Sequence, residues 1–113
     1  RPLSDLMSRH PSGFGRWLVA LDFHLGPVAE VAVVWPPGEA GLDALLHEVF
    51  ARYNPNRVVV GALDEAEAAQ GLPLLDSRTT VGERATAYLC HRYVCKAPTS
   101  DPEVLARQLA GEL

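Results

Sequence analysis

The chain has 113 residues, of which 48% are apolar and 21% are charged, and its net charge is −4. This length allows one domain, because domains run at roughly 100–150 residues, and the composition excludes a disordered chain. The acidic balance argues against nucleic acid as a partner. No apolar run approaches the ~20 residues that cross a bilayer, and no signal-peptide pattern is visible. We therefore expect no nucleic-acid or membrane partner and a cytoplasmic location.

Residues 1–25 predict a helical lead. A short helical turn near the start is broken by His-Pro-Ser-Gly at positions 10–13. A second helix follows and ends at Gly26-Pro27. Its apolar side chains recur at helical spacing on one stripe, which must pack on something substantial: Phe14, Trp17, Leu18, Leu21 and Leu25.

A strand–helix–strand unit comes next. Residues 28–35 read VAEVAVVW and residues 57–63 read RVVVGAL, both typical of strands buried on two faces. Between them, apolar residues from Leu42 to Tyr53 recur at helical spacing. Two strands joined by a helix predict parallel pairing, and we place the first strand in the centre of the sheet.

The last third of the chain predicts one more strand and a closing helix. The acidic, Ala-rich residues 64–70 fit either a short helix or a loop. Residues 85–90, ATAYLC, form the third strand, and Tyr93-Val94-Cys95 either continue it or return beside it. Either a Ser100–Glu103 capping box or Asp101 before Pro102 starts the last helix. The predicted fold is a small α/β domain with a mostly parallel three-stranded sheet flanked by helices.

Cys90 and Cys95 are the sharpest chemical feature of the sequence. On one continuous strand these residues would point to opposite faces and lie roughly 17 Å apart, whereas a disulfide needs Cα atoms within about 7 Å. Only a tight turn at His91-Arg92 would bring the sulfurs together. We therefore favour structural free cysteines, with a disulfide or redox pair and a metal site as alternatives. No cofactor motif and no metal-ligand spacing stands out.

Two further features bear on a possible site. Glu30 interrupts an apolar strand, and it is either a general acid or base, or a wet or Arg-paired carboxylate at the strand entrance. In a parallel sheet, ligands bind beyond the carboxyl ends of the strands. That rule places a possible ligand site near Trp35, Leu63 and His91.

Several segments together resemble a known family. They are Pro-Ser-Gly-Phe at 11–14, Ala-Leu-Asp-Phe at 20–23, Tyr-Asn-Pro-Asn at 53–56 and, most specifically, Thr-Ala-Tyr-Leu-Cys at 86–90 with Cys-Lys-Ala-Pro-Thr-Ser-Asp-Pro at 95–102. The chain resembles the C-terminal region of the thioredoxin-domain-containing proteins related to spermatogenesis-associated protein twenty. The resemblance implies a thioredoxin-like domain and an (α/α) toroid, similar to N-acylglucosamine 2-epimerases and six-hairpin glycosidases, before this chain. It implies no catalytic residue here.

The resemblance divides the chain into residues 1–25, the end of the preceding toroid, and residues 26–113, a small α/β module. The leading hypothesis is a non-catalytic structural or interaction module whose partner is the remainder of its parent chain, so that the chain alone is no enzyme. The alternatives are a thiol redox element that uses Cys90 and Cys95, and a small-ligand-binding α/β domain.

Overall fold

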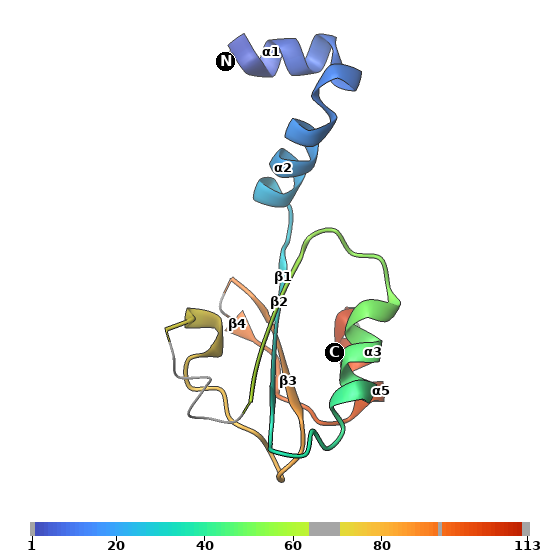
Figure 1. Ribbon diagram of the computed structural model, residues 1–113. Coiled ribbons are helices and arrows are strands. Elements are labelled where there is room, and N and C mark those ends of the chain that lie inside the picture. Colours follow the sequence, from blue (N-terminus) through green and yellow to red (C-terminus); the bar gives the residue numbers. More distant parts are fainter. Residues whose placement is uncertain (1, 64–70, 93, 112–113) are drawn as a thin grey trace.

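The structure is a computed structural model that describes residues 2–63, 71–92 and 94–111. It opens with a helical arm made of α1 (Pro2–Arg9), the short 3₁₀ helix η1 (Pro11–Phe14) and α2 (Gly15–Leu25). The arm projects away from the rest of the chain (Figure 1). The predicted helix and its end at Gly26 are confirmed, and the amide of Gly26 donates to the Asp22 carbonyl oxygen at 2.8 Å.

The remainder is an α/β module built on one sheet. Its described strands are β1 (Ala29–Trp35), β2 (Arg57–Leu63), β3 (Thr86–His91) and β4 (Val94–Cys95), in the order β2-β1-β3-β4. The interior place of β1 confirms the expectation for the first strand. β1 and β2 are parallel and joined through α3 (Leu42–Ala51), as the strand–helix–strand pattern predicts.

The expected mostly parallel, three-stranded sheet is wrong, because the sheet is mixed and has four strands. β3 runs antiparallel to β1, and β4 runs antiparallel to β3. An apolar run such as Ala85–Cys90 carries no mark of its direction, so the prediction rested on an assumed second crossover helix. Between β2 and β3 the described residues instead contain the short 3₁₀ helix η2 (Pro73–Leu75). The alternative of a helix or a loop at 64–70 lies outside the described residues.

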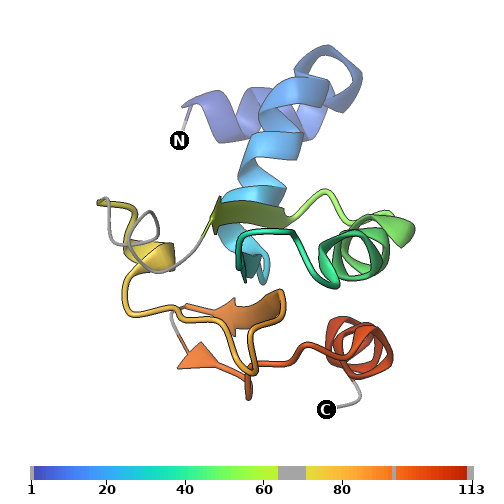
Figure 2. The same cartoon turned by 60° about the horizontal axis from the view of Figure 1, so that its bottom comes forward.

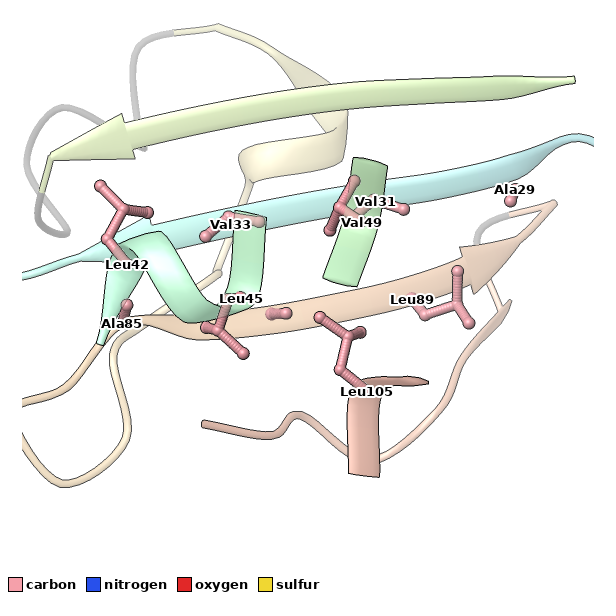
Figure 3. Close-up of a cluster of buried hydrophobic side chains, with 10 residues drawn as sticks. Ala29, Val31, Val33, Leu42, Leu45, Val49, Ala85, Leu89 and Leu105 are labelled. Carbon is pink, nitrogen blue, oxygen red and sulfur yellow. The ribbon is translucent and has the colours of Figure 1, made fainter. Parts of the chain in front are cut away.

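The two inner strands of the sheet, β1 and β3, are buried on both faces. On one face, alternate residues of β1 and β3 pack against α3 and α5 (Pro102–Leu109), and Figure 3 shows these side chains meeting Leu45, Val49 and Leu105. The other face is covered by the segment around η2. Figure 2 shows the two helices on one side of the sheet and η2 on the other. The second cluster comprises Ala32, Val34, Ala62, Leu75, Tyr88 and Cys90.

The closing helix begins as one of the two predicted caps requires. The Asp101 side chain accepts a hydrogen bond from the amide of Glu103 at 2.8 Å, and Pro102 occupies the first turn. Backbone bonds between Ala87 and Thr99, at 2.8 and 3.1 Å, hold the chain before this helix against β3.

Candidate functional site

The two cysteines face each other across a hairpin. Cys90 and Cys95 are register partners of β3 and β4, with Cα atoms 3.9 Å apart, and a disulfide joins them with an S–S distance of 2.00 Å. The expectation of free cysteines is therefore wrong. Its geometry assumed one continuous strand, whereas Val94 and Cys95 form β4 and return beside β3.

The chain reverses between His91 and Val94, which are also register partners. Arg92 lies in this turn with φ of 51°, a left-handed conformation that two-residue hairpin loops require. Two contacts fix the turn against the entrance of β1. The His91 Nδ1–H donates to the Val28 carbonyl oxygen at 3.1 Å, and the Arg92 amide donates to Glu30 Oε1 at 3.1 Å.

Glu30 is paired through the backbone. Its Oε1 accepts the Arg92 amide, while Oε2 is buried and has no hydrogen-bond partner among the described residues. Glu30 is also the register partner of Cys90, so its side chain lies on the same face of the sheet as the disulfide. The carboxylate therefore holds the hairpin turn through the backbone amide of Arg92. Pairing with an arginine side chain was one of the alternatives that the sequence left open.

Arg78 lies directly against the disulfide. Its Nη2 is 2.9 Å from Cys95 Sγ and 3.6 Å from Cys90 Sγ, and its Nε donates to the Leu74 carbonyl oxygen at 3.3 Å. The guanidinium stacks over the Tyr88 ring, with 5.0 Å between its central carbon and the ring centroid. Sequence reasoning missed Arg78, because it precedes the cysteines by 12 and 17 residues and no spacing signal links them.

The Tyr88 ring is itself held in place. Its hydroxyl donates to the Thr79 carbonyl oxygen at 2.6 Å, and the Thr79 amide approaches the same hydroxyl at 3.2 Å. Because Thr79 follows Arg78, these bonds fix the segment that presents the guanidinium. The site is thus a partly buried disulfide with one positioned cation.

The three residues of the predicted ligand site do not come together. Trp35 and Leu63 are register partners at the carboxyl ends of β1 and β2. His91 lies at the opposite end of the sheet, beside Val28, because β3 is antiparallel to β1. Among the described residues, no group of three or more His, Cys, Asp or Glu side chains could hold a metal ion.

A second feature lies on the arm. An apolar groove of about 690 Å³ runs between α1 and α2, and no residue of α2 is buried. Trp17 is 58% exposed and Leu25 is 70% exposed. The apolar stripe that the sequence predicts is present, but within the described chain it packs on nothing substantial. The main residues that line the groove are Leu3, Met7, Trp17, Leu18, Leu21 and His24.

None of the described helices is long and apolar enough to cross a membrane.

These features define a small α/β module with a disulfide-closed hairpin and an apolar helical arm. The chain is homologous to spermatogenesis-associated protein 20: it is 28% identical over 108 residues to the proteins of that name from Rattus norvegicus and Mus musculus, and 26% identical to the one from Homo sapiens. Each alignment covers 94% of this chain, which spans only 14% of each relative's length. No family model and no solved structure matches the chain.

Proposed function

We propose that this chain is a non-catalytic C-terminal structural or interaction module of a larger, cytoplasmic, thioredoxin-domain-containing and epimerase-like protein. In this proposal residues 1–25 end a preceding (α/α) toroid, and residues 26–113 form the module that packs against it. The partner of the arm is therefore the remainder of the parent chain. Homology to a much longer relative supports this proposal.

The exposed apolar groove of the arm carries the proposal. Neither core cluster of the sheet contains a residue of α2, which buries none of its own residues. A Trp side chain buries up to roughly 250 Å², so covering the 58% of Trp17 that is exposed would contribute about 3 kcal/mol. An arm that leaves such a residue in water is best explained by a partner surface that covers it.

The test compares one substitution in two contexts. Trp17→Ser in the 113-residue chain should change the melting temperature little, whereas in the parent protein it should lower the melting temperature by several degrees. Tyr53→Ser is the matched control, because Tyr53 is 93% exposed on the module and should have no effect in either context. Equal melting temperatures for wild-type and Trp17→Ser parent protein would reject docking through the arm.

A thiol redox element is the second candidate function, and the formed disulfide favours it. Disulfides in cytosolic proteins are usually transient and either catalytic or redox-sensing. In the proposed cytoplasmic location, a pair that bridges is therefore a candidate for redox exchange. Mass spectrometry of the protein under graded thiol buffers should find both the bridged and the dithiol forms. A bond that persists at every thiol ratio would exclude this function.

A further inference from the structure

The disulfide has a cation fixed on it. Arg78 Nη2 contacts both sulfurs, at 2.9 and 3.6 Å, while the Leu74 carbonyl and the Tyr88 ring hold the guanidinium from other sides. The sulfur atoms of a disulfide are uncharged and accept hydrogen bonds weakly. The guanidinium therefore gains little from the bridged form compared with what two thiolates would offer it.

Reduction changes the charge at this position. A thiol beside an arginine has a lowered pKa, because the cation stabilises the thiolate. Two other titratable groups lie on the same face: Glu30 from β1, whose negative charge acts in the opposite direction, and the Tyr88 phenol from β3. Arg78 carries the charged group that lies within hydrogen-bond distance of both sulfurs.

We propose that Arg78 makes the Cys90–Cys95 bond readily reducible, so that the hairpin exchanges electrons with an external dithiol. This inference rests on the redox function proposed above and identifies its substrate class and its positioning residue. The external dithiol is either a small molecule or a protein, and in both cases a thiolate attacks the disulfide. A reduced state that is stabilised relative to the disulfide is the general basis of an oxidising redox pair.

The exchange follows from the burial of the two sulfurs. Cys90 is fully buried and Cys95 is half-buried, so the incoming thiolate attacks Cys95 Sγ. A mixed disulfide forms as the Cys90–Cys95 bond breaks, and its electron pair leaves on Cys90 Sγ, next to Arg78. The second thiol of the external dithiol then loses its proton and attacks the first, which releases Cys95 as a thiolate. The dithiol becomes a disulfide, and this protein gains two electrons.

The hairpin keeps its backbone pairing through this change. Next to Cys95, the amide of Lys96 donates to the Leu89 carbonyl oxygen at 2.9 Å, and Thr99 is bonded in both directions to Ala87. These bonds hold the chain on β3 whether or not the sulfurs are joined. Reduction therefore changes the charge and the cross-link without dissolving the fold, as a reversible element requires.

The test measures the equilibrium between this disulfide and a reference dithiol, dithiothreitol, at pH 6 and pH 9. At pH 9, where thiolates are populated, Arg78→Met should disfavour reduction on the order of tenfold, which corresponds to about 30 mV. At pH 6, where thiols are protonated, the variant and the wild type should differ little. Arg78→Lys should restore part of the effect at pH 9. Arg107→Met, at an exposed position of α5 on the other side of the sheet, is the matched control and should behave as the wild type.

The outcomes separate the two proposals. A wild-type bond that dithiothreitol cannot reduce at either pH overturns both the redox function and the role of Arg78. A reducible wild-type bond with an unchanged equilibrium in Arg78→Met overturns the role of Arg78 alone. An equal change at both pH values also overturns it, since a packing defect acts independently of thiol ionisation. A thioredoxin-type protein dithiol and a small-molecule dithiol such as dihydrolipoamide, tested in parallel, then decide whether the exchange partner is a protein or a small molecule.

Discussion

Reducing the disulfide should cost the module about 2 kcal/mol of stability and leave it folded. The closed loop runs from Cys90 to Cys95 and contains only six residues. In the chain-entropy description, a loop of this size restricts the unfolded chain by about 2 kcal/mol at 25 °C. The Cys90→Ala/Cys95→Ala double variant should lose about 1 kcal/mol more, because Cys90 is fully buried and its sulfur leaves a small cavity.

Urea unfolding followed by the fluorescence of Trp35 measures these losses. Trp35 packs against the core, and a Trp17→Phe background leaves it as the only reporter. The free energy of unfolding falls with urea by about 1–3 kcal/mol/M, so the urea concentration at the unfolding midpoint should fall by about 1–2 M while this slope stays unchanged. The amide of Thr99 should stay protected from hydrogen exchange, because its bond to Ala87 does not depend on the sulfurs. A loss of 5 kcal/mol or unfolding on reduction would refute the reasoning, and so would no loss.

Three further substitutions test the fold around the site, each by urea or thermal unfolding. Leu105→Ala should cost about 2–5 kcal/mol, because this side chain is fully buried between α5 and the sheet; a cost below 1 kcal/mol would mean that α5 does not close the core. Asp101→Ala should cost about 1 kcal/mol through the lost cap, and Asp101→Asn should retain most of it. Gly61→Ala should cost about 1–2 kcal/mol, because a Cβ there would lie 2.7 Å from the Trp35 ring. The stability cost of Gly61→Ala should vanish in a Trp35→Ala background. An equal cost in both backgrounds would contradict a clash with the Trp35 ring.

The sequence predicts those parts of the fold that local patterns determine. The β-branched runs of β1 and β2 define their strands, and their spacing around α3 determines their parallel pairing. The direction of β3 could not be predicted in the same way, since its residues are buried on both faces and an apolar run reads alike in either direction. Strand direction depends on the connection, and the sequence leaves residues 64–70 of the connection before β3 open between a short helix and a loop.

Of the disulfide and the cation that form the candidate site, the sequence predicts only the two cysteines. Arg92 has a positive φ in the hairpin turn. A glycine or asparagine at this position would have predicted a two-residue hairpin loop, but an arginine does not. Because that signal is missing, the prediction treated residues 90–95 as a single strand, which would keep the two sulfurs apart. The contact of Arg78 depends on how the segment after η2 folds over the sheet, which is a tertiary effect with no local pattern. The prediction placed His91 near Trp35 because it assumed a parallel β3. In a parallel strand, His91 would lie at the same end of the sheet as Trp35, whereas the antiparallel β3 puts it at the opposite end.

The two proposed functions meet at the base of the arm. The residues between the two cysteines hold the entrance of β1: His91 donates to the Val28 carbonyl oxygen, and the Arg92 amide donates to Glu30. Val28 lies only two residues after Gly26, where α2 ends, and Asn56 Nδ2 donates to Asp22 Oδ2 at 2.9 Å on the other side of this junction. The disulfide closes the hairpin that makes the first two contacts, so the proposed redox site and the base of the arm share the entrance of β1.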